Sequence, residues 1–141
     1  MAILDEVPGV EVAVQIAGED VVEYDDPEPP SNDNATYPIS NKYIECIDGA
    51  EFRIRYKAGE QYNWGYKNHS LQFKVQVDGL YINAYILGES HLFNSHYING
   101  RLSKDPHTSQ VYLHRCKFSA ITTGTFNHSL SYIQQVLIMP Y

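Results

Sequence analysis

Apolar and polar residues alternate along much of this chain, and a two-residue period is typical of β-strands that bury one face. The alternation is clearest in residues 10–16, 50–57 and 71–77. In the second run, Phe52 and Ile54 share one face and charged residues occupy the other. A slip of one residue would turn the apolar face to water, so the pattern also sets the register. Shorter strands are predicted at residues 21–24, 43–47, 80–86, 91–98, 110–118 and 132–139.

Turn signals separate several of these runs. Type I′ turns need positive φ at both central residues, and Asp-Gly and Asn-Gly pairs accept this conformation. Three such pairs follow predicted strands: Asp48-Gly49, Asp78-Gly79 and Asn99-Gly100. The first two are predicted to close hairpins that join residues 43–47 to 50–56 and residues 71–77 to 80–86. A further turn at residues 18–20 is predicted to fold residues 21–24 back onto the first strand.

These elements predict an all-β protein. About eight short antiparallel strands, with almost no helical periodicity, favour a single β-sandwich, jelly-roll-like or immunoglobulin-like, and a barrel is the alternative. A chain of 141 residues suits one domain, so we expect residues 1–141 to form one sandwich. The acidic, proline-rich composition of about residues 25–39 predicts a long loop, because proline cannot donate to a strand ladder.

The charge is distributed unevenly along the chain, whose formal net charge is −7. The stretch before Lys42 holds 10 of the 17 acidic residues and no basic residue, which leaves 10 basic and 7 acidic residues, a net charge of +3, in the remainder. The negative total argues against nucleic-acid binding, which depends on phosphate neutralisation. No run is long enough to span a membrane, and the acidic N-terminus does not resemble a secretory signal. Without an export signal, we predict an intracellular protein, cytoplasmic or nuclear. Cys46 and Cys116 have apolar neighbours and are expected as buried free thiols.

The segment between the second and third clear strands carries three aromatic residues at alternate positions, Tyr62, Trp64 and Tyr66. Aromatic rings interleaved with Asn and Gly form stacking platforms for sugars or anchors for proteins. The alternative is structural, because tryptophan is highly buried on average and Trp64 would then cap one end of the sandwich. Both interpretations follow equally well from the pattern.

A second candidate binding surface is a basic stripe on the polar faces of two predicted strands. It consists of Arg53, Arg55, Lys57 and Lys74, of which Arg53 and Arg55 are the candidate binding residues. Such residues also serve simply as solubilising charges on an outer sheet face.

Six histidines raise the question of a metal site, but their spacing does not favour one. On a single strand His91 and His96 would point to opposite faces and would not share a metal. A shared face for Tyr112, His114 and Cys116 gives at most two neighbouring ligands, fewer than zinc prefers. No nucleophile elbow or phosphate-binding loop is present. We therefore predict no metal, no cofactor and no catalytic residue.

Several pieces of the chain together resemble the start of an uncharacterised fungal domain family. They include Pro8-Gly9-Val10-Glu11-Val12 within residues 4–12, the stretch from Tyr43-Ile44-Glu45 to Tyr56, Leu71-Gln72-Phe73-Lys74-Val75-Gln76-Val77-Asp78-Gly79, and Cys116-Lys117-Phe118-Ser119-Ala120-Ile121. The resemblance extends over residues 4–123 and implies an N-terminal β-sandwich-like domain, usually followed by a variable extension. It implies no catalytic residues. Residues 127–141 depart from the family's final strand.

The sequence thus predicts a non-catalytic interaction module. Strand edges and the 12 tyrosines favour a protein partner or a homo-oligomer, since both features suit strand addition and contact surfaces. The alternative is a carbohydrate-binding, lectin-like module that uses the aromatic loop. Quenching of Trp64 emission by sugars would distinguish the two.

Overall fold

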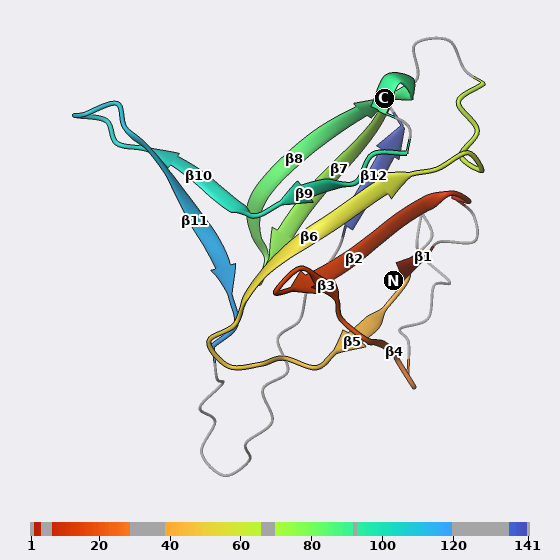
Figure 1. Cartoon of the computed structure of the whole chain (residues 1–141), viewed down its shortest axis with the longest axis horizontal. Coiled ribbons are helices and arrows are strands. Elements are labelled where there is room, and N and C mark those ends of the chain that lie inside the picture. The colour runs from red at the N-terminus through yellow and green to blue at the C-terminus, as the bar shows by residue number, and fades with distance from the viewer. Residues whose placement is uncertain are drawn as a thin grey trace.

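The computed structural model describes residues 2–3, 7–28, 39–65, 70–91, 93–119 and 136–140. In this part of the chain two β-sheets pack face to face (Figure 1). The larger sheet has the path β1-β2-β6-β11-β10, with β3 paired to β2 and β9 paired to β6. Its strands are β1 (Ala2–Ile3), β2 (Val10–Ile16), β3 (Glu19–Asp20), β6 (Glu51–Ala58), β9 (His96–Ile98), β10 (Gly100–Lys104) and β11 (Val111–Lys117).

The smaller sheet has the order β12-β7-β8 and covers one face of the larger one. It contains β7 (Ser70–Val77), β8 (Leu80–Gly88) and β12 (Val136–Pro140), all antiparallel. A third, two-stranded sheet pairs β4 (Glu23–Asp25) with β5 (Lys42–Ile44). A short 3-10 helix, η1 (Glu89–His91), follows β8.

The core lies between β6 and β7, because each strand turns one apolar face toward the other. Phe52, Ile54 and Tyr56 of β6 are buried, as are Leu71 and Phe73 of β7. The rings of Tyr56 and Phe73 stack with centroids 4.6 Å apart and join the two layers. The all-β sandwich prediction is confirmed, and the sheets do not close into the alternative barrel.

One of the predicted hairpins is confirmed. Asp78 and Gly79 both have positive φ, 50° and 74°, and they join β7 to β8 as a type I′ turn requires. A bulge after Val75 leaves one extra residue in β8.

The hairpin predicted at Asp48-Gly49 is wrong. Gly49 has a positive φ of 75°, and Ala50 donates to the Ile47 carbonyl, so a turn forms there. The strand before it, β5, pairs with β4, however, and β6 pairs with β2 from Phe52 to Ala58. A turn signal shows where the chain reverses and does not determine which strand becomes the neighbour.

The Asn99-Gly100 turn does not close a hairpin either, because it lies at a branch point of the large sheet. β9 pairs with β6 through Ile98, and the next strand, β10, pairs with β11 instead. The strand predicted over residues 91–98 begins only at His96. Gly100 fits this branch because its φ is +152° and a Cβ there would lie 2.0 Å from the His114 carbonyl oxygen.

Near the N-terminus the tight turn is one residue earlier than predicted. Ala17 and Gly18 have positive φ and join β2 to β3, and the strand predicted at residues 21–24 becomes β4, paired with β5. Of the predicted loop at residues 25–39, Asp25 belongs to β4 and residues 29–38 lie outside the described part. At the C-terminus the predicted strand is present as β12.

Candidate functional site

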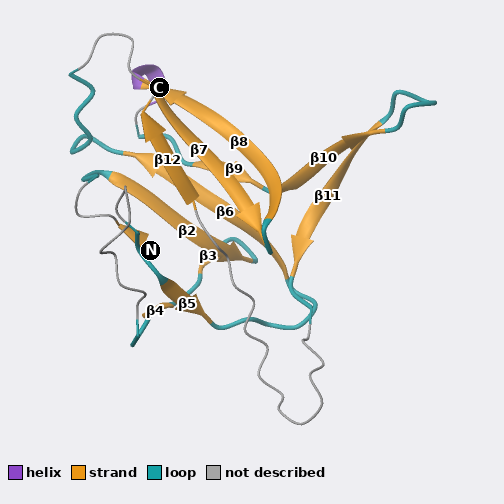
Figure 2. Ribbon diagram, turned by 180° about the vertical axis from the view of Figure 1, so that it is seen from behind, coloured by secondary structure: helices purple, strands orange, loops and turns teal. Residues whose placement is uncertain are grey.

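The hairpin formed by β10 and β11 projects away from both sheets of the sandwich (Figure 2). We call residues 100–117 the arm. β11 pairs with β6 only through Cys116 and Lys117, so the rest of the arm leaves the sheet. β10 ends the path of the large sheet, and no strand among the described residues pairs with its outer edge.

The tip of the arm is held by its own polar groups. The Asp105 carboxylate accepts hydrogen bonds from the backbone N–H groups of His107 at 2.7 Å and Thr108 at 3.0 Å. These bonds favour the ionised form and lower the pKa of Asp105. Ser109 supplies the positive φ, 59°, that returns the chain to β11. The arm is therefore a formed hairpin as far as its tip.

Apolar side chains are exposed along the arm. Leu102 and Leu113 lie directly opposite one another and are 59% and 45% exposed, and Val111 beside them is 63% exposed. Residues that pair directly across two strands share a face, so these three form one apolar patch. Tyr112, on the other face, is exposed too. A contiguous exposed patch of this kind marks an interaction surface more often than isolated apolar residues do.

The arm is also basic. It contains four basic residues and one acidic residue, Asp105, which gives it a formal net charge of +3 within a chain of net charge −7. The basic residues are Arg101, Lys104, Arg115 and Lys117. Of these, Arg115 is paired with Glu51 of β6 at 2.8 Å, and this contact fixes the base of the arm to the sandwich.

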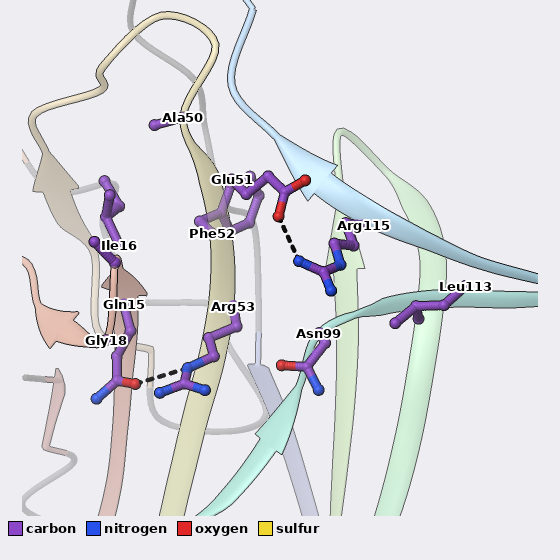
Figure 3. Close-up of a pocket in the computed structure, with 11 residues that line it drawn as sticks. Gln15, Ile16, Gly18, Ala50, Glu51, Phe52, Arg53, Asn99, Leu113 and Arg115 are labelled. Atoms are coloured by element: carbon purple, nitrogen blue, oxygen red, sulfur yellow. Dashed lines mark hydrogen bonds and ion pairs between the residues drawn. The ribbon is translucent and has the colours of Figure 1, made fainter.

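A cleft of about 710 Å³ lies where the arm leaves the large sheet (Figure 3). Its walls come from the β2–β3 turn, the start of β6, Asn99 and the base of β11. Its polar side chains bond to one another: Arg53 donates to Gln15 at 2.9 Å, and Arg115 donates to Glu51. Leu113 belongs both to this cleft and to the apolar patch of the arm. The cleft and the arm therefore form one continuous surface.

The two candidate arginines have partners within the domain. Arg53 lines the cleft and lies 4.2 Å above the Tyr97 ring in a cation–π contact. Arg55 forms ion pairs with Asp20 at 2.6 Å and Glu11 at 3.4 Å. Hydrogen bonding to the Arg55 guanidinium lowers the pKa of Asp20. The ion pair therefore stabilises the fold fully at pH values above 3.8, the ordinary pKa of an aspartate. This stabilisation is lost as the pH falls through the lowered pKa of Asp20.

The predicted basic stripe does not form one surface. Arg53, Arg55 and Lys57 share the outer face of β6, whereas Lys74 belongs to β7 in the other sheet. Because the buried faces of these strands meet in the core, their polar faces point in opposite directions.

The aromatic loop packs against the sandwich. The rings of Tyr62 and Trp64 meet edge to face with centroids 4.8 Å apart, and both residues are half-buried against the core. Burial raises the pKa of the Tyr62 hydroxyl. Gly9 allows this packing, since a Cβ at Gly9 would lie 2.4 Å from the Tyr62 backbone nitrogen. Tyr66 lies outside the described residues.

A comparison with known protein families matches most of the chain to a single family. The profile of a domain of unknown function, DUF7918, matches residues 9–135. The chain belongs to the DUF7918 family. The match confirms the resemblance to an uncharacterised domain family and spans the strands from β2 to the end of the arm, including the cleft. No curated protein and no solved structure matches the chain significantly.

In this DUF7918 domain His91 and His96 lie close together, contrary to the prediction that they point to opposite faces of one strand. His91 is in η1 and His96 is in β9, and their rings meet with centroids 5.7 Å apart. The prediction was wrong because the chain bends between them. His96 also stacks on Tyr56 and Tyr85. On the arm, His114 Nε2 bonds to the Ser103 hydroxyl at 2.6 Å.

Two further properties concern only the described part of the DUF7918 domain. No group of three or more His, Cys, Asp or Glu side chains is close enough together there to hold a metal ion. Nor does that part contain a helix whose length and apolar character would allow it to cross a membrane.

Proposed function

We propose that this DUF7918 domain is a non-catalytic interaction module that binds another protein through the arm. The observation that carries the proposal is the patch of Leu102, Val111 and Leu113, exposed on a hairpin that projects from a sandwich with its own core. Burying such a patch against a partner removes apolar surface from water. An isolated two-stranded hairpin is only marginally stable in water, so a partner would also stabilise the arm itself.

The cleft supports a binding role over a catalytic one. Arg115 is engaged by Glu51 and fixes the base of the arm, and Arg53 is engaged by Gln15 and the Tyr97 ring within the large sheet. Neither Cys116 nor Cys46 is in a disulfide, and burial raises the pKa of the Cys116 thiol, which makes it less reactive. Free thiols also support an intracellular location.

Site-specific photo-crosslinking tests the proposal. A photoreactive residue in place of Leu102 should capture a partner protein in cells that express the domain, because the partner covers this side chain. Leu80 provides a matched control, since it is 65% exposed but lies at the β7–β8 turn, outside the arm. The same probe at position 80 should capture little.

The captured protein is then purified and titrated with the domain. Binding should be lost in a variant with both Leu102→Ser and Val111→Ser and retained in Leu80→Ser. Equal capture from positions 80 and 102, or full binding by the arm variant, would show that the arm is not the interaction surface.

A further inference from the structure

We propose that the arm binds a second copy of this chain, at the acidic segment formed by residues 19–28. This inference rests on the proposed function, because it names the partner of the same surface. The acidic segment contains β3, β4 and the residues that follow, with six acidic residues and no basic one. They are Glu19, Asp20, Glu23, Asp25, Asp26 and Glu28.

The acidic segment resembles the arm in its exposed apolar residues and its open strand edge, but it has the opposite charge. Val22 and Tyr24 are exposed apolar residues of the segment, placed among its carboxylates. β4 pairs with β5 on one edge, and among the described strands none pairs with its other edge. An open strand edge with alternating acidic and apolar residues is therefore available for strand addition.

The arm offers the complementary surface. β10 has an outer edge without a strand partner in the described part of the chain. It carries Lys104 on the same face as Leu102 and Arg101 on the other face. Pairing β10 with β4 could place Tyr24 beside Leu102 on one face and a carboxylate of Glu23 or Asp25 beside Arg101 on the other. Complementary charge of this kind speeds association and selects the partner.

A pairing between two arms is less favourable. Each arm carries a net charge of +3, so two arms brought edge to edge would repel one another. Arg55 pairs with Asp20 and Lys42 pairs with Asp25, but the other four carboxylates still give the acidic segment the opposite charge. The segment also has a similar pattern of exposed apolar residues. Charge thus selects the acidic segment of a second copy over its arm.

The contact has to be intermolecular. The arm and the β4–β5 sheet lie on opposite sides of the sandwich, and the arm points away from the acidic segment of its own chain (Figures 1 and 2). The two surfaces that meet are different, so the contact is head-to-tail. Such contacts build rings or open chains of subunits, and they leave one free arm on any open assembly.

Sedimentation equilibrium of the purified chain tests the inference. The average mass should rise with protein concentration at low ionic strength, and added salt should suppress the rise because it screens the charges. An arm variant with Arg101→Glu and Lys104→Glu has an arm of net charge −1. A segment variant with Glu19→Lys, Asp25→Lys, Asp26→Lys and Glu28→Lys has a segment of net charge +2. Each variant should associate about tenfold or more weakly than the parent chain.

Mixing the two variants gives the sharpest result. The arm variant alone has two acidic surfaces and the segment variant alone has two basic ones. In an equimolar mixture the acidic arm of the first variant meets the basic segment of the second. The mixture should therefore recover association. A control with Lys57→Glu and Lys74→Glu makes the same net charge change as the arm variant, but outside the arm, and should associate like the parent chain.

The outcomes separate this inference from the proposed function. A chain that stays monomeric up to about 1 mM, the range of very weak complexes, overturns the inference. So does a mixture that fails to recover association, or a control that weakens it equally. If the probe at position 102 still captures a different protein, the proposed function stands. If it captures none, both fail.

Discussion

Replacing Phe73 with alanine is expected to remove much of the stability of the fold. Phe73 is 0% exposed at the centre of β7, and its ring stacks on Tyr56 across the two sheets. Truncation of a buried aromatic ring loses its transfer free energy and leaves a cavity, which together cost about 3–5 kcal/mol. Small domains have a total free energy of unfolding of about 5–15 kcal/mol. Chemical denaturation of the purified variant measures the loss.

The neighbouring residue in β7 provides the control. Gln72 is half-buried on the opposite face of the strand, so Gln72→Ala should change the free energy of unfolding by about 0.5 kcal/mol or less. The difference between the two losses in free energy of unfolding shows directly which face of β7 is buried. Similar losses from both would contradict the assignment of its buried face.

Replacing Gly100 with alanine is expected to disrupt the arm and leave the sandwich folded. A Cβ at Gly100 would lie 2.0 Å from the His114 carbonyl oxygen, within the pairing of β10 and β11. Its φ of +152° is also unfavourable for any residue with a side chain, at a cost of about 1–3 kcal/mol. The strain acts on the base of the arm, which contributes little to the core. Proteolysis at the arm should therefore become much faster.

Gly88→Ala serves as the matched substitution in this test. Gly88 ends β8, and a Cβ there would meet no atom within 4 Å. This variant should resist proteolysis at the arm as well as the parent chain does. Equal resistance of Gly100→Ala would mean that the backbone at residue 100 tolerates a side chain, and that the branch between β9 and β10 is built differently.

The sequence predicts the local structure of this domain better than its topology. The alternation in β6 and β7 reveals their buried faces, because burial of one face leaves a two-residue period. Asp78-Gly79 identifies a hairpin because β7 and β8 are neighbours both in the chain and in the sheet. At Gly49 and Gly100 the same signal fails, since the strands beside these turns take their partners from distant parts of the chain.

The candidate site follows less directly from the sequence. Three consecutive apolar residues, 111–113, read as part of a half-buried strand, and only the departure of the arm from the sheet exposes them. The sequence nevertheless contained a hint of this exposure, because three consecutive apolar residues break the alternation expected of a strand with one solvent-exposed face. Tyr62 and Trp64 show the opposite behaviour. Their pattern suits an exposed platform, yet both rings pack against the core.

Hydrogen exchange of dilute protein tests most directly whether the arm is exposed to solvent while the sandwich itself is stably folded. Amides in β6 and β7 should exchange slowly, because both strands are paired on two edges and lie at the core. Amides of residues 101–104 and 111–115 should exchange much faster and become protected only as the protein concentration rises. Slow exchange of the arm at high dilution, equal to that of β7, would contradict this structure and the proposed role of the arm.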